Sequence, residues 1–218
     1  MNTPLSSSAP QPSEREVTGF FKDILLGKNK AVAAFLDTYP AALEKKDKYG
    51  TTPLAMAAQA AAADMAALLL GRGACVDAEA NTGTTPLMWA AEQGCDDIIK
   101  LLLGKGAYAD NKDDSGETAL MWAARNEHKS TIELLLENGA SLNAKNRYGE
   151  TALDIAREGY DLTSTDEAAA MAEAGVVALL EQWPERKRAQ FLQDTDCSRG
   201  LKKAIPKPRL FKIPRPKP

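Results

Sequence analysis

The chain has 218 residues, of which 26% are charged and 44% are hydrophobic, a composition typical of a globular protein. It contains no apolar run near the ~20 residues that a membrane-spanning helix needs, and its first 13 residues lack the basic start and apolar core of a secretory signal peptide. Cys75, Cys95 and Cys197 are too few and too unevenly spaced for a disulfide framework. We therefore expect a protein of a reducing, cytoplasmic compartment.

The net charge of −3 conceals an uneven distribution along the chain. Eight of the 27 Lys and Arg residues lie in 198–218, a segment without any acidic residue. The preceding 197 residues hold the other 19 basic residues and all 30 acidic ones, a net charge of −11. An acidic body with a basic end bears on the choice of partners rather than on the fold.

The first predicted element is a helix that follows a Ser- and Pro-rich leader, residues 1–13. The leader lacks the apolar residues that a folded segment needs, and we expect it to be disordered. Ser13 is a favoured N-cap, and Glu14 and Glu16 suit the positively polarised first turn of a helix. Apolar residues then recur twice at helical spacing, which predicts a pair of helices within 14–46.

One motif then recurs every 33 residues. It reads TPLAMAA at 52–58, TPLMWAA at 85–91, TALMWAA at 118–124 and TALDIA at 151–156. A fixed period of this length indicates stacked helical units, each in contact only with its neighbours, rather than one globular core. Thr is a favoured N-cap, and Pro at the first helical position lacks only an N–H group that would have no partner there, so each motif is predicted to begin a helix.

Three further features keep the same period. They are a glycine before each motif (Gly50, Gly83, Gly116, Gly149), a leucine triplet behind it (68–70, 101–103, 134–136) and a Gly-Ala pair after the triplet (from Gly73, Gly106 and Gly139). This pattern resembles the ankyrin repeat, which has a Gly-x-Thr-Pro-Leu start, an Ala-Ala pair, a leucine-rich second helix and a Gly-Ala ending. The resemblance covers 14–159 well and 160–183 loosely. It implies an all-α ankyrin-repeat solenoid of helix-turn-helix units joined by short hairpin loops.

The resemblance also divides the chain into units. We expect a repeat domain over 14–192, made of repeats 14–46, 47–79, 80–112 and 113–145 and an elongated last repeat or cap, 146–192. The first unit lacks the Thr-Pro-Leu start, as expected of a terminal cap whose outer face contacts water. In the last unit we expect a longer second helix from Ser164 to about Gln182, and a short closing helix from Pro184 through Leu192.

His128 is the only histidine and so the only candidate for the base of a Ser-His or Cys-His pair. No Ser or Cys accompanies it in a recognisable motif, and ankyrin-like repeats often carry a structural histidine at the start of a second helix. We expect no catalytic residue and no enzyme activity. Cys75 is expected to pack as a small apolar residue, and Cys95 to be partly exposed at a helix start that slightly stabilises its thiolate.

Four acidic residues fall on one predicted hairpin tip: Asp110, Asp113, Asp114 and Glu117. Calcium loops gather such residues, but the closing Glu of an EF-hand is missing. The cysteines and His128 also lack the short spacing of a zinc site. We therefore interpret the cluster as a solvated tip and expect no metal and no cofactor.

Function is expected to be protein–protein interaction, because the resemblance implies a partner held on the hairpin tips and the first helices, the concave face. The tip positions that it carries over are Lys48, Tyr49, Thr51, Asn81, Thr82, Thr84, Asp114, Ser115, Glu117, Arg147, Tyr148 and Glu150. The helix positions are Gln59, Glu92, Gln93, Arg125 and Asn126, and Trp89 and Trp122 on the same helices are further candidates because Trp is enriched at binding sites. Two interpretations of the tryptophans stay open, an aromatic anchor for a partner or packing between repeats. We expect a monomer without a small-molecule substrate.

The basic tail, 193–218, offers alternatives. Its alternating prolines favour an extended polyproline II conformation, and apolar residues interleave with the charges. We expect a short binding segment anchored by Phe211, which contacts either the acidic array of the same molecule or an acidic partner. A tail-driven tether to nucleic acid or an anionic membrane, and a purely solubilising end, are the other hypotheses.

A pair of tail variants separates these hypotheses. Charge attraction is screened beyond ~8–10 Å at physiological salt, whereas burial of an aromatic ring persists. Phe211→Ala should therefore weaken partner binding at high salt, and joint neutralisation of Lys202, Lys203 and Lys207 should weaken it mainly at low salt. The readouts are partner affinity and amide exchange across the tail. If neither variant changes either readout, the tail is only a solubilising end.

Overall fold

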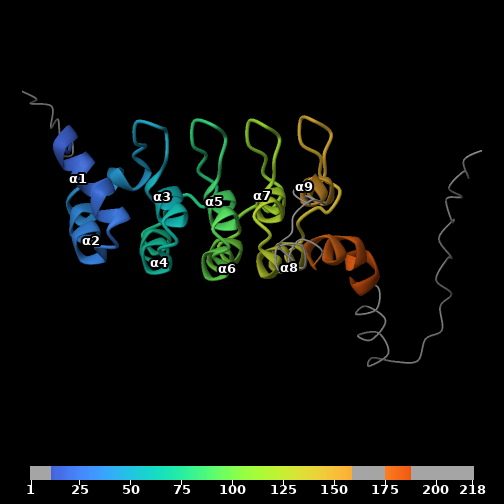
Figure 1. The fold of residues 1–218 in the computed structure, drawn as a ribbon. Helices are drawn as coiled ribbons and strands as arrows, with labels where there is room; N and C mark the ends of the chain where they lie inside the picture. Colours follow the sequence, from blue (N-terminus) through green and yellow to red (C-terminus); the bar gives the residue numbers. More distant parts are fainter. Residues whose placement is uncertain (1–10, 159–174, 188–218) are drawn as a thin grey trace, which may run out of the picture. The chain divides into compact units, whose positions relative to one another are not determined.

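The computed structural model describes residues 11–158 and 175–187, and these residues contain helices and no strand (Figure 1). The helices are α1 (Glu14–Leu25), α2 (Asn29–Thr38), the 3-10 helix η1 (Pro40–Glu44), α3 (Pro53–Gln59), α4 (Ala63–Gly71), α5 (Pro86–Glu92), α6 (Asp96–Gly104), α7 (Ala119–Arg125), α8 (Lys129–Glu137) and α9 (Ala152–Glu158). Residues 175–187 are helical as well. The expected all-α solenoid is confirmed.

The predicted helix starts are confirmed by their caps. Before α1, the Ser13 backbone N–H donates to the Glu16 carboxylate at 2.8 Å, and the Glu16 N–H donates to Ser13 Oγ at 3.4 Å. The hydroxyls of Thr52 and Thr85 accept from backbone N–H groups three residues on, at 3.3 and 3.4 Å. Because these side chains satisfy N–H groups that have no partner inside the helix, they fix where each short helix begins.

Each repeat contributes one helix to each of two rows. The first helices α3, α5, α7 and α9 pack on one another in succession, and the second helices α4, α6 and α8 do the same. In Figure 1 the hairpin loops all rise on the side of the first helices. The alanine pairs are almost completely buried because they let the helices approach closely, while Leu120, Ile98 and Ile132 fill the space between repeats.

The last unit differs from the expectation at Pro184. A proline was expected to start a new helix there, but the helical residues 175–187 include Pro184. A proline removes one backbone hydrogen bond and crowds the preceding turn, which can bend a helix without ending it. Other parts of the expected helices, 164–174 and 188–192, lie outside the described residues, as does the tail.

The chain divides into two compact units, residues 1–181 and 182–218. The first unit contains all the labelled helices, and the expected domain boundary at 192 stays a prediction. Within the described residues, no helix is long and apolar enough to cross a membrane.

A row of acidic side chains joins successive repeats behind the second helices. Each carboxylate accepts a backbone N–H from the next repeat, in the pairs Glu44 with Cys75 (2.7 Å), Asp77 with Tyr108 (3.2 Å) and Asp110 with Ser141 (2.7 Å). The three acceptors are 33 residues apart, so one contact recurs with the period of the sequence. It fixes the register between neighbours.

Gly83 should tolerate alanine poorly. Its φ is +72°, and an added Cβ would lie 3.1 Å from Asp114 N and 3.2 Å from Asp113 Cα, in the backbone of the next hairpin loop. We predict that Gly83→Ala lowers the free energy of unfolding by about 2 kcal/mol or more, measured by urea denaturation. The control is Gly104→Ala in α6, where a Cβ meets open space and stability should rise by about 0.5 kcal/mol. Equal effects at the two positions would contradict this account.

Candidate functional site

The hairpin loops 47–51, 80–84, 113–117 and 146–150 are called the finger loops below. A cleft of about 440 Å³ opens between the first three finger loops and the helices α5 and α7. Its lining residues are Tyr49, Thr51, Ala80, Thr82, Thr84, Trp89, Asp113, Asp114, Ser115 and Trp122. The structure thus brings together eight of the expected partner-binding residues from three successive repeats. The expected set did not contain Ala80 or Asp113.

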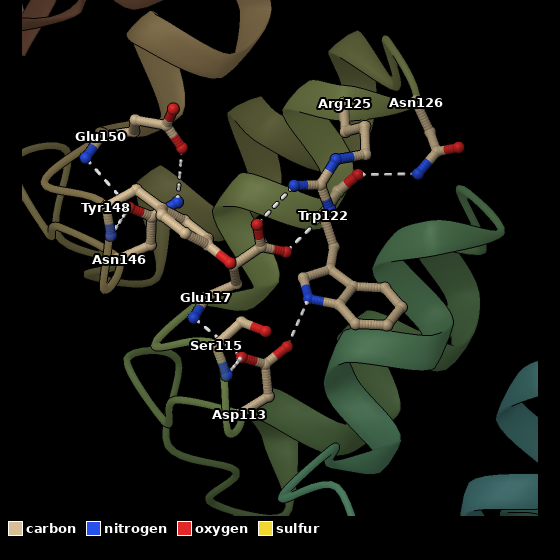
Figure 2. Close-up of polar contacts among 9 residues, drawn as sticks. All are labelled: Asp113, Ser115, Glu117, Trp122, Arg125, Asn126, Asn146, Tyr148 and Glu150. Carbon is tan, nitrogen blue, oxygen red and sulfur yellow. Dashed lines mark hydrogen bonds and ion pairs between the residues drawn. The ribbon is translucent and has the colours of Figure 1, made fainter.

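Asp113 organises its finger loop (Figure 2). Its Oδ1 accepts the backbone N–H groups of Ser115 at 2.8 Å and Glu117 at 2.9 Å, and its Oδ2 accepts the indole Nε1–H of Trp122 at 3.2 Å. One carboxylate therefore closes the loop and ties it to α7. The signal in the sequence is the set of residues at 47, 80, 113 and 146, which keep the 33-residue period and lie five residues before each recurring motif.

The same position is an oxygen acceptor in two other finger loops. Asp47 Oδ1 accepts from Tyr49 N at 2.9 Å and from Thr51 N at 2.8 Å. Asn146 Oδ1 accepts from Tyr148 N at 3.0 Å and from Glu150 N at 2.9 Å. The finger loop 80–84 has Ala80 instead and therefore lacks this acceptor.

Arg125 and Glu117 form a two-bond ion pair beside the cleft (Figure 2). Arg125 Nη1 donates to Glu117 Oε2 at 2.7 Å, and Nη2 donates to Oε1. The hydrogen bonds to Glu117 raise the pKa of the Arg125 guanidinium. Because Glu117 is buried, its side chain supports the loop, and Arg125 presents a cation that is already partly neutralised.

Trp89 and Trp122 pack on each other and also line the cleft. Their ring centroids are 5.7 Å apart, and the ring planes meet at 69°, an edge-to-face contact. Both side chains are half-buried. Trp122 Nε1 has its acceptor in Asp113, whereas Trp89 Nε1 is buried without an acceptor among the described residues. The two interpretations of these tryptophans are therefore not exclusive.

The remaining expected residues differ in exposure. Thr51 and Thr84 are buried like Glu117, and Glu92 and Glu150 are half-buried. Exposed side chains are those of Lys48, Gln59, Asn81, Gln93, Asn126, Arg147 and Tyr148. Asn126 Nδ2 donates to the Trp122 carbonyl at 2.9 Å, so part of its bonding is used within α7. Phe211 lies outside the described residues.

Two expectations about the cysteines are wrong. Cys75 is exposed rather than packed, because Ala74 before it takes the buried position and the Cys75 side chain lies outside. Cys95 is half-exposed at a helix start as expected, but its thiolate is not stabilised. Burial and then the charges of Asp96 and Asp97 raise the pKa of this thiol.

The interpretation of the acidic cluster as a solvated tip is also wrong for three of its four residues. Of its four members only Asp114 is exposed, because Asp110 and Asp113 accept backbone N–H groups and Glu117 is paired with Arg125. Within the described ranges, no three His, Cys, Asp or Glu residues form a group that could hold a metal ion.

The structural interpretation of the histidine is confirmed. His128 lies at the start of α8, and its Nε2 is 2.8 Å from the backbone carbonyl oxygen of Glu92. Its ring packs so closely against Gly94 that a Cβ there would approach it to 2.7 Å.

Comparison with known families identifies the architecture. The family model described as ankyrin repeats (3 copies) matches residues 24–113 and 100–164. A search of curated proteins found no match.

Asp113 should contribute more to stability than Asp47, because it accepts the indole N–H in addition to two backbone N–H groups. We predict that Asp113→Ala lowers the free energy of unfolding by about 2 kcal/mol, as measured by urea denaturation, and that Asp47→Ala lowers it less. Trp122→Phe, which removes the indole donor together with part of the aromatic ring system, should cost at least this difference. An Asp113→Ala variant as stable as wild type would refute the role assigned to this carboxylate.

Proposed function

The chain belongs to the ankyrin repeat family, and we propose that it binds a protein partner in the cleft between the finger loops and the first helices. Ankyrin repeats are generally protein–protein interaction modules, and stacked repeats create extended concave binding surfaces. The proposal is that this chain uses that surface for an extended segment of a partner and has no catalytic role.

The aromatic lining of the cleft carries the proposal. Tyr49, Trp89 and Trp122 line one cleft of about 440 Å³, and Tyr and Trp are the side chains most enriched where interfaces gain their binding energy. Tyr49 is 65% exposed, so its ring can be covered by a partner. The two tryptophans are held by mutual packing, which lowers the entropy lost when a ligand covers them.

Backbone hydrogen bonds between neighbouring finger loops support the same proposal. Asp114 N donates to Thr82 O at 3.0 Å, and Arg147 N donates to Ser115 O at 2.9 Å. Loops joined in this way present their tips at fixed spacing, which preorganises the surface for a ligand that spans several repeats. A cleft open along three repeats suits an extended peptide segment better than a small molecule.

Charge indicates which partners approach. Residues 1–197 carry a net charge of −11, and Asp114 is exposed on a finger tip. Positively charged groups at the rim of the partner are therefore favoured and speed the encounter. Thr51, Thr84 and Glu117, which are buried, are assigned to positioning the loops rather than to contact.

Other parts of the proposal rest on the sequence. We propose that the protein is a cytoplasmic monomer. The contact between the basic tail and either the acidic array or an anionic partner stays a hypothesis, because residues 188–218 lie outside the described ranges.

Selection from a displayed library of random peptides tests the proposed function. Peptides selected on the wild-type protein should bind Tyr49→Ala at least tenfold more weakly, because that ring lines the cleft. The matched control is Tyr108→Ala, which removes an equally exposed tyrosine, 62% against 65%, that does not line the cleft. Calorimetric affinities provide the measurement. Equal losses for the two variants, or none, would contradict binding in the cleft.

A further inference from the structure

We propose that the Ala80 finger, residues 80–84, binds a side-chain carboxyl or carboxamide oxygen of the partner through its backbone N–H groups. This oxygen takes the place that the side chains of Asp47, Asp113 and Asn146 fill in the other finger loops. The inference rests on the proposed function, since the oxygen comes from a partner segment in the cleft. It adds the chemical class of the recognised group, an Asp-like or Asn-like side chain.

The backbone of the Ala80 finger is already shaped for such an acceptor. Ala80 N donates to Thr84 O at 2.9 Å, and Gly83 N donates to Ala80 O at 3.0 Å. The corresponding bonds of the Asp113 loop, to Glu117 O and from Gly116 N, are 3.0 and 2.8 Å. Matching backbone bonds place the N–H groups of residues 82 and 84 as those of 115 and 117 are placed around the Asp113 carboxylate.

The donors of the Ala80 finger lack their acceptor. The backbone N–H groups of Thr82 and Thr84 have no hydrogen-bond partner within the described part of the chain. Their hydroxyls bond to each other at 2.8 Å and so do not replace the acceptor. In the loops of Asp47, Asp113 and Asn146, the corresponding pair of N–H groups shares one side-chain oxygen.

Trp89 supplies a third donor. It occupies the position of Trp122 one repeat earlier, yet its Nε1 is buried and has no acceptor among the described residues. A buried donor without a partner is costly. In the Asp113 loop the indole N–H bonds the second carboxylate oxygen, Oδ2. A partner carboxylate whose first oxygen is held by Thr82 N and Thr84 N therefore gives Trp89 Nε1 an acceptor in its second oxygen, once the indole takes the orientation that Trp122 has towards Asp113.

The position is reachable from solvent. Ala80, Thr82, Thr84 and Trp89 all line the cleft, whereas in the neighbouring loop the Asp113 side chain occupies the corresponding place. A partner side chain that enters the cleft therefore meets the two backbone donors without displacing a side chain of the protein, and it reaches the third donor once the Trp89 indole reorients. The short alanine is what leaves this approach open.

Two oxygen groups fit the donors. Asp47 and Asp113 show that a carboxylate satisfies them, and Asn146 shows that a carboxamide oxygen satisfies the two backbone N–H groups. Three convergent donors favour the carboxylate. The nearby charges of Asp113 and Asp114 favour the neutral carboxamide, although screening weakens their effect beyond ~8–10 Å. Acetate and acetamide are therefore the probes that distinguish the two.

Titration of the full chain followed by NMR tests the inference directly. Acetate or acetamide, compared with sodium chloride at matched ionic strength, should shift the Thr82 and Thr84 amide signals and the Trp89 indole signal in a saturable way. The internal control is the neighbouring loop, where the amide signals of Ser115 and Glu117 should not move. The inference is wrong if neither probe shifts the Ala80 finger more than sodium chloride does, or if the two loops respond equally.

Two variants supply the missing acceptor oxygen of the Ala80 finger from the chain itself. Ala80→Asp should raise the melting temperature, give the Trp89 indole a hydrogen-bonded signal like that of Trp122, and abolish the response to both probes. It should also weaken the selected peptides about tenfold or more. Ala80→Asn, whose single oxygen accepts only the two backbone N–H groups, should also raise the melting temperature and weaken the selected peptides, which excludes mere charge repulsion. If the peptides bind wild type and both variants equally while Tyr49→Ala still loses them, this inference fails and the proposed function stands.

Discussion

Burial of each helical pair against its neighbours is the constraint on which the rest of this structure depends. The first helices α3, α5, α7 and α9 have seven residues each, far fewer than an isolated helix needs in water. They persist because their alanine and leucine faces are buried between adjacent repeats. Hydrogen bonds such as that from the Ser141 backbone N–H to the Asp110 carboxylate then fix the register of one repeat on the next.

The same stacking produces the surface that we propose for binding. When repeats are held in register, the finger loops stand side by side, and backbone bonds such as Arg147 N to Ser115 O join their tips. Some polar residues that could contact a partner instead form hydrogen bonds within the repeats. Glu117 is buried against Arg125, and Asp113 closes its loop and holds Trp122. What remains for a partner is an aromatic cleft with polar rims and one finger loop without its own acceptor.

The repeat architecture could be predicted from the sequence because its signals are local and periodic. The caps at Ser13, Thr52 and Thr85 depend on residues within one turn of a helix, and a 33-residue period repeats them often enough to be unmistakable. Positions at which two repeats meet could not be predicted in this way. Cys75 was expected to pack as a small apolar residue and is exposed, since the adjacent Ala74 takes the buried position.

The cleft illustrates the same limit. Six of its lining residues followed from the family pattern, and Trp89 and Trp122 from the enrichment of tryptophan at interfaces, but the role of Asp113 depends on an indole nine residues further along the chain. The acidic cluster was interpreted as a solvated tip for this reason, since charge alone does not show which carboxylates are already bonded. The raised pKa of the Cys95 thiol likewise comes from burial and from two neighbouring carboxylates that outweigh the helix start.

Hydrogen–deuterium exchange of the protein with and without a selected peptide tests the central claim most directly, because it maps the binding face without any prior choice of residues to substitute. The account predicts that the peptide slows exchange in the finger loops 47–51, 80–84 and 113–117 and leaves α4, α6 and α8 unchanged. Protection confined to the second helices, with the finger loops exchanging as in the free protein, would contradict it.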